Sequence, residues 1–122
     1  MSETALPGST FNKFFPKQGG DIDIVFKQEK SGFAQASLLR SGKPLAMLSI
    51  FDTRNNPQAR EKFSSAQESI QGFPSVVREN TTSILVADRF QVQIQSEGDA
   101  LTAADRAAWF EKFDLEGLKN AF

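Results

Sequence analysis

The residues of this chain that could carry acid-base or metal chemistry are its carboxylates. Asp21 and Asp23 stand two positions apart at the start of an alternating apolar and polar segment, so both would project from one face of a strand. Carboxylate oxygens suit a hard cation such as Mg²⁺, but two ligands are too few to hold one, and a solvated strand edge is the favoured interpretation. No metal site is therefore predicted.

Asp88 is the candidate for acid catalysis. It lies with Arg89 between two apolar runs, so one continuous strand would place its carboxyl beside Val86 and Phe90, where a desolvated acid can act as a catalyst. A tight hairpin turn at Ala87 and Asp88 would instead leave the carboxyl exposed at the tip. The hairpin is the favoured interpretation.

Several residue types that most catalytic sites use are missing, because the sequence contains no cysteine, no histidine and no tyrosine. Without them the chain can form no disulfide, no zinc–cysteine site, no ordinary haem site and no Ser-His-Asp triad. An enzyme built on this chain would have to use Asp and Glu with Ser, Lys or Arg. We therefore expect a non-catalytic protein without a cofactor, and a carboxylate-based enzyme is the weaker alternative.

A row of glutamines is the most informative feature for binding. Gln91, Gln93 and Gln95 alternate with Val92 and Ile94, so one strand face presents uncharged amides while the other packs inward. Amides are less strongly hydrated than Lys or Glu side chains, so a protein partner or a second copy of the chain could cover them. An ordinary solvated sheet face is the alternative interpretation.

Aromatic residues suggest a second kind of binding site. The chain has 12 Phe and one Trp, and most of these rings should fill the core. The alternative is a cavity for a small apolar ligand, lined by Phe26, Phe51, Phe63, Phe90 and Phe113. Trp109 is either a surface anchor for a partner or, as favoured here, part of the core beneath a helix.

Residues 52–56 (DTRNN) precede a predicted helix and could bind a small anion at its N-terminus. No glycine-rich phosphate loop accompanies them, so turn and cap roles are favoured.

Length and charge predict one small domain that binds no nucleic acid. The chain has 122 residues, 39% hydrophobic and 24% charged, which suits a single packed domain. Residues 1–61 carry 8 basic and 6 acidic side chains, a net charge of +2, and residues 62–122 carry 6 and 9, a net charge of −3. Neither half offers a strongly basic surface for a polyanion.

The sequence contains no run of apolar residues long enough to span a membrane as a helix. We expect a soluble, cytoplasmic protein, although a chain shortened from a secreted or lipid-anchored precursor would look the same.

The elements that position these residues can be predicted from periodicity and turn residues. We expect an α+β fold with helices packed on an antiparallel sheet, in the approximate order βββα-βββα, which raises the possibility of an internal duplication. Residues 1–10 are a predicted flexible segment, and residues 11–122 form a single domain that opens with a helical turn. Predicted strands cover 21–29, 33–40, 44–52, 75–79, 82–87 and 89–96.

Two helices are predicted between and after these strands. The first is capped by Asn56 before Pro57, presents Phe63, Ala66 and Ile70 to the sheet, and ends near Gly72. The second begins at a capping box formed by Thr102 and Asp105, and a further cap at Asp114 starts a final helical turn.

Overall fold

The computed structural model describes residues 8–30, 32–56 and 58–121, which form one seven-stranded antiparallel sheet with three α-helices and three short 3-10 helices. The strands are β1 (Ile22–Lys30), β2 (Phe33–Arg40), β3 (Lys43–Asp52), β4 (Glu68–Ile70), β5 (Phe73–Arg78), β6 (Thr81–Val86) and β7 (Phe90–Ser96). The helices are α1 (Gln58–Glu61), α2 (Ala103–Trp109) and α3 (Leu115–Ala121), and the 3-10 helices are η1 (Gly8–Phe14), η2 (Thr53–Asn55) and η3 (Phe110–Lys112).

The strand order across the sheet is β1-β2-β3-β7-β6-β5-β4. Two meanders, β1 to β3 and β4 to β7, therefore meet along the β3–β7 pair, in which Leu48 lies opposite Ile94 and Ile50 opposite Val92. Apolar residues at every second position of these strands point to the same face, which fixes the register because a slip of one residue would turn them to the other face.

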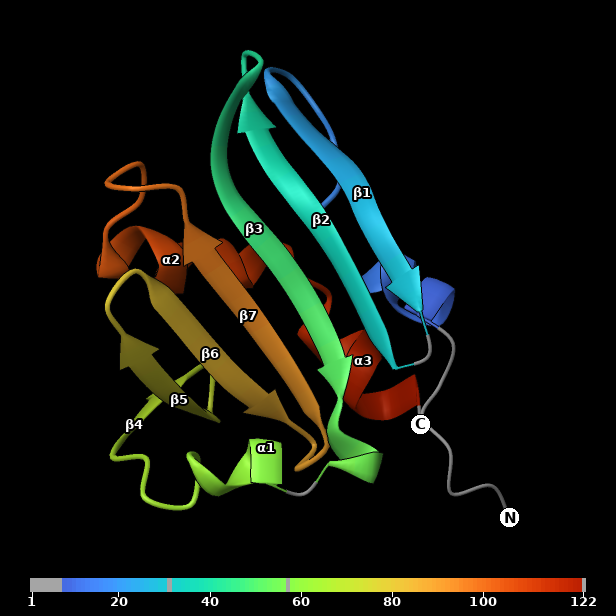
Figure 1. Cartoon of the computed structure of the whole chain (residues 1–122), viewed down its shortest axis with the longest axis vertical. Helices are drawn as coiled ribbons and strands as arrows, with labels where there is room; N and C mark the ends of the chain where they lie inside the picture. The colour runs from blue at the N-terminus through green and yellow to red at the C-terminus, as the bar shows by residue number, and fades with distance from the viewer. Residues whose placement is uncertain (1–7, 31, 57, 122) are drawn as a thin grey trace.

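One face of the sheet is covered and the other is open (Figure 1). Helices α2 and α3 lie behind the strands in this view, and the buried core lies between them and the sheet. Phe11, Phe14 and Phe15 add to this core from η1 and the residue after it, as expected of the predicted helical turn. The short α1 lies on the viewer's side, at the end of the sheet near the β6–β7 turn.

The predicted strands are confirmed with shifts of one or two residues at their ends, and so is the hairpin at Ala87 and Asp88. Both residues have positive φ, 57° and 56°, the Arg89 amide donates to the Val86 carbonyl, and Val86 pairs with Phe90 across a three-residue loop. Positive φ at both central residues is the conformation of a type I′ turn, whose twist matches that of the strands. Asp88 is exposed at the tip. Acid catalysis by Asp88 required a buried carboxyl, so the structure does not support that interpretation.

The long helix predicted to end near Gly72 is wrong. Only Gln58–Glu61 is α-helical, and Ser64 donates hydrogen bonds from both its hydroxyl and its amide to the Glu61 carbonyl, which closes the turn locally. Gln71 and Gly72, with φ of 55° and 86°, instead form a hairpin turn between β4 and β5. Ile70 therefore belongs to an edge strand, where it pairs with Phe73.

Asn56, the predicted cap of α1, stands between η2 and α1. Asn56 has φ −142° and ψ 74° and ends η2, where its amide donates to the Thr53 carbonyl, while its own carbonyl accepts from Ala59. Pro57 lies outside the described residues. The order of elements is thus three strands, a short helix, four strands and two helices, and the predicted duplication is not confirmed.

The second half of the chain ends as predicted. The Thr102 hydroxyl accepts from the Asp105 amide while the Asp105 carboxylate accepts from the Thr102 amide, which completes the capping box of α2. The Asp114 carboxylate accepts from the Gly117 amide at the start of α3. Of the predicted flexible segment, residues 1–7 lie outside the described residues and residues 8–10 already belong to η1.

Candidate functional site

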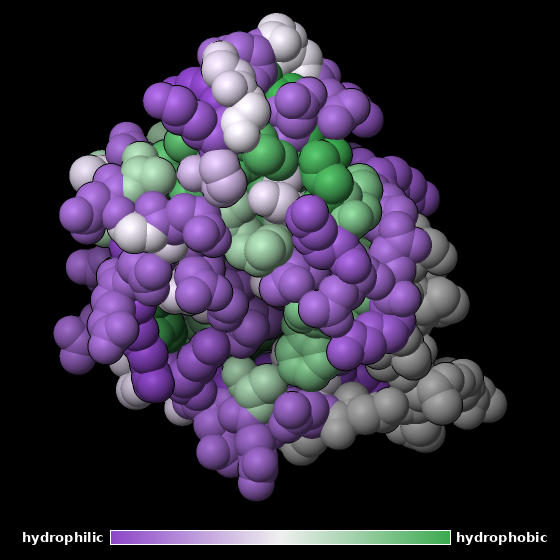
Figure 2. Space-filling view, turned by 45° about the horizontal axis from the view of Figure 1, so that its top comes forward, coloured by the Kyte–Doolittle hydropathy of each residue, from purple (hydrophilic) through white to green (hydrophobic). Residues whose placement is uncertain are grey.

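The candidate site is the face of the sheet that α2 and α3 leave uncovered. We call it the open face and define it by three residues from each of four adjacent strands: Phe33, Gln35 and Ser37 on β2; Met47, Ser49 and Phe51 on β3; Gln91, Gln93 and Gln95 on β7; and Thr81, Ser83 and Leu85 on β6. None of these residues is charged. Figure 2 views this side obliquely and shows apolar side chains gathered among hydrophilic ones.

Cross-strand rows organise the open face. Gln35, Ser49, Gln93 and Ser83 stand opposite one another in sequence across β2, β3, β7 and β6. A second row joins Ser37, Met47, Gln95 and Thr81, and a third joins Phe33, Phe51, Gln91 and Leu85. Charged side chains stand at two ends of these rows, where Lys30 lies opposite Phe33 and Arg78 opposite Thr81. At three other ends the next residue across the sheet is uncharged: Val25, Gln28 or Val76.

The predicted glutamine row is present on one face of β7. Gln91 and Gln93 are half-buried and Gln95 is exposed, whereas Val92 and Ile94 are fully buried on the other face. The Gln93 side-chain oxygen accepts from the Ser83 hydroxyl at 3.1 Å and from the Gln91 amide at 3.3 Å. These two bonds fix the Gln93 amide group and turn its NH₂ donors away from both partners.

A hollow beside the glutamine row has a volume of about 400 Å³ and is called here the β5–β7 hollow. It is lined by Lys62, Val76, Arg78, Glu79, Asn80, Thr81, Ser83, Gln93 and Gln95. Burial, and to a smaller extent the positive charge of Arg78, lowers the pKa of Lys62 below its ordinary value of 10.5. The two cations therefore lie close enough to repel each other.

The five phenylalanines of the predicted ligand cavity are divided between the two faces of the sheet. Phe90 and Phe113 belong to the covered core, and Phe26 at 36% exposure contacts this core through Phe15. Phe51 lies on the open face beside Phe33, with ring centroids 6.5 Å apart. Phe63 is buried outside the main core cluster.

A larger pocket, of about 590 Å³, opens between η1, the start of β1 and the α2–α3 region. We call it the tryptophan pocket, and it is lined by Lys13, Phe15, Pro16, Lys17, Gly19, Ile22, Trp109, Glu111, Lys112, Phe113 and Asp114. Of the five phenylalanines predicted to line a ligand cavity, Phe113 is in the lining of this pocket. Trp109 is half-buried, so it is neither fully in the core nor a free surface anchor.

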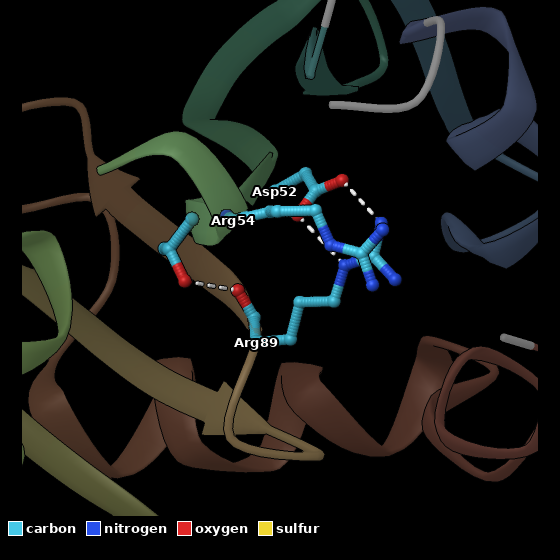
Figure 3. A network of polar contacts seen from close by, with 4 residues as sticks. Asp52, Arg54 and Arg89 are labelled. Atoms are coloured by element: carbon cyan, nitrogen blue, oxygen red, sulfur yellow. Dashed lines mark hydrogen bonds and ion pairs between the residues drawn. The ribbon is translucent and has the colours of Figure 1, made fainter. Parts of the chain in front are cut away.

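Residues 52–56 act through turn and cap interactions. The Asp52 carboxylate is fully buried, accepts from the Arg54 amide at the start of η2, and receives both ends of the Arg89 guanidinium at 2.8 and 2.7 Å (Figure 3). The hydrogen bond to Asp52 raises the pKa of Arg89, and burial partly opposes this effect. The hydroxyl and the amide of Thr53 also bind the Arg89 carbonyl, so the segment is anchored to the β6–β7 turn.

Arg106 is the polar residue that the sequence analysis missed. It is 3% exposed and donates to the Thr82 and Ser96 hydroxyls and to the carbonyls of Leu101 and Glu79, at 2.8 to 3.3 Å. Within the described part of the chain no carboxylate pairs with it. The available signal was its position four residues after the Thr102 cap, on a helix whose other residues include four alanines. The network fastens α2 to the sheet and is structural.

Comparison of the chain with protein-family models, curated proteins and solved structures gave no match. Among the described residues no helix is long and apolar enough to cross a membrane, and no three acidic side chains gather where they could hold a metal ion.

Proposed function

We propose that this protein is a small non-catalytic binding domain whose open face contacts another protein, either a partner or a second copy of the chain. The observation that supports this proposal is the uncharged character of twelve positions, three on each of four adjacent strands. Charged residues are depleted at the centres of protein interfaces, because each one covered by a partner must lose its water. A sheet face also offers a rigid surface, which limits the entropy lost on binding.

A charge introduced on the open face should weaken this association at least ten-fold. Met47 is a central residue of the open face that solvent reaches and that lies outside the lining of the β5–β7 hollow, so Met47→Glu should place an unpaired carboxylate in the interface while leaving the thermal midpoint unchanged within a few degrees. The first measurement is native mass spectrometry of the gently purified protein, which reports copies per particle and retained partners. Sedimentation or titration calorimetry then gives the affinity of each variant.

The matched control is Asn120→Asp, which adds the same charge at an exposed position of α3, on the covered side of the sheet. Equal affinities for the wild type, Met47→Glu and this control would contradict the proposal. Gln93→Glu and Gln95→Glu are weaker tests than Met47→Glu, because both glutamines line the β5–β7 hollow together with Lys62 and Arg78, which would neutralise the new carboxylate.

A second candidate function is the binding of a small apolar ligand, now placed in the tryptophan pocket. Apolar and aromatic walls at Phe15, Ile22, Trp109 and Phe113 support it. The lining also holds three lysines and two carboxylates, a net charge of +3 − 2, or +1, which suits an anionic head group. Trp109 is the single tryptophan of the chain, so its fluorescence reports this pocket alone.

Decanoate, a simple amphipathic acid, should shift Trp109 emission to shorter wavelength in a saturable titration. Ile22→Asn replaces an apolar wall by an amide and should weaken decanoate binding several-fold. Val77→Asn makes the same kind of change at a position that is 47% exposed, outside the pocket lining, and should leave binding unchanged. A linear, unsaturable fluorescence response in the wild type would contradict this candidate.

A carboxylate-based enzyme has less support than either binding function, because Asp88 is exposed at a hairpin tip. A cytoplasmic location and the lack of nucleic-acid binding stay predictions from composition and charge.

A further inference from the structure

The β5–β7 hollow contains two cations whose charges no carboxylate neutralises. In the described part of the chain, neither Lys62 nor Arg78 lies within ion-pair distance of an acidic side chain, and the Arg78 guanidinium makes no hydrogen bond. The Lys62 ammonium has one ring contact, 5.4 Å from the Phe63 centroid. By contrast, Arg40 and Arg89 each pair with an aspartate.

The hollow also presents a fixed hydrogen-bond donor. The Gln93 oxygen already accepts two bonds, from Ser83 and Gln91, so the outward-facing end of this amide is its NH₂ group. In the described residues that NH₂ group has no acceptor. Lys62, Arg78 and Gln93 thus bring an ammonium, a guanidinium and an amide donor to one concave site.

We propose that the β5–β7 hollow is a binding site for a small phosphate-bearing molecule, held by Lys62, Arg78 and the Gln93 amide. Glu79 supplies the carboxylate in the lining, so the formal charge of the wall is +2 − 1, or +1. Arginine presents a planar fork that matches two phosphate oxygens, and lysine adds a point charge. The volume of about 400 Å³ suits a phosphate ester of small size.

Lys62 and Arg78 repel each other, so an anion bound between them would stabilise the protonated form of Lys62. Because burial and Arg78 lower the pKa of Lys62, its protonated form is disfavoured in the folded protein. An anion placed between the two cations would offset the free-energy cost of protonating Lys62. Removal of Lys62 should therefore weaken binding at least ten-fold without lowering stability.

Titration calorimetry with inorganic phosphate, at constant ionic strength maintained with chloride, tests the proposal on the full chain. We expect saturable binding by the wild type and at least ten-fold weaker binding by Lys62→Met and by Arg78→Met. Lys119→Met, at an exposed position on α3, is the matched control and should bind phosphate as the wild type does. Acetate in place of phosphate separates tetrahedral phosphate recognition from simple carboxylate pairing, and acetate should bind more weakly.

Stability and pH give two further readouts. The thermal midpoint of Lys62→Met should equal or exceed that of the wild type. Phosphate is a dianion above a pH of about 7. Because the pKa of Lys62 is lowered, the phosphate affinity of the wild type should already fall with rising pH below the ordinary lysine pKa of 10.5, as Lys62 loses its proton, while the affinity of Lys62→Met should stay flat over the same range. Unsaturable binding by the wild type, acetate binding as tight as phosphate binding, or equal losses in Lys62→Met and Lys119→Met would overturn the proposal.

This inference does not rest on the proposed protein-binding function, because phosphate is titrated into the isolated protein. Loss of partner binding in Met47→Glu with intact phosphate binding, or the reverse result in Lys62→Met, would separate the two.

Discussion

Replacement of Arg106 by methionine should lower the free energy of unfolding by about 3 kcal/mol. Arg106 is 3% exposed and donates to two hydroxyls and two carbonyls from four segments of the chain. Methionine fills similar space but donates nothing, so the buried Leu101 carbonyl and the Thr82 and Ser96 hydroxyls would lose these bonds. Urea-induced unfolding of both proteins measures the difference.

Arg106→Lys discriminates between charge and geometry in this network. Lysine keeps the charge and three donors but lacks the planar fork, so it should recover part of the loss and not all of it. Lys112→Met, at an exposed position just after α2, is the control and should change stability by less than about 0.5 kcal/mol. An Arg106→Met variant as stable as this control would show that water replaces the guanidinium at no cost.

Arg89→Met should destabilise the fold by about 3 to 5 kcal/mol, because it leaves the buried Asp52 carboxylate without its bidentate partner. The Asp52 side chain is 0% exposed, whereas the Arg89 side chain is 17% exposed. The charge that loses its ion-pair partner would therefore be the fully buried one. The double variant Asp52→Asn with Arg89→Met should recover part of the stability that Arg89→Met loses. Asparagine removes the charge and still offers an oxygen to the Arg54 amide.

The exposed pair between Asp21 and Arg40 is the matched control for this experiment. Its N–O distance is 3.7 Å and both side chains are more than half exposed, so Arg40→Met should cost less than about 1 kcal/mol. Chemical denaturation of the three variants gives the comparison. Equal effects of Arg89→Met and Arg40→Met would mean that solvent screens the Asp52 pair as well.

The two networks have a common architectural role. Arg106 ties α2 to β6 and to the end of β7, and Asp52 with Arg89 ties the end of β3 to the β6–β7 turn. Both lie on the covered side or at the rim of the sheet, and neither network uses a residue of the open face. A binding surface can change without loss of stability when such interactions lie elsewhere.

Local signals in the sequence determined the meander of β1 to β3, the Ala87-Asp88 hairpin and the caps at Thr102 and Asp114. Each depends on alternation or turn chemistry within a few residues, and such signals survive folding because local preference and tertiary packing agree. The glutamine row was predictable for the same reason, since strand alternation alone places Gln91, Gln93 and Gln95 on one face.

Tertiary contacts decided what residues 58–72 became. Their apolar spacing suits a helix, but a Gln71-Gly72 hairpin lets Glu68–Ile70 pair with β5 at the sheet edge, and backbone pairing outweighs a weak helical preference. The fold likewise brings Lys62 and Arg78 into the lining of one hollow, although 15 residues of sequence separate them.

The sequence by itself therefore determined the strands, most turns and the chemical classes that are missing from this protein. Only the tertiary structure decided which polar side chains are buried together and which remain available for binding. The physical reason is that the burial of Arg106, the pairing of Asp52 with Arg89 and the unpaired state of Lys62 and Arg78 depend on contacts between segments distant in sequence, for which local periodicity holds no information.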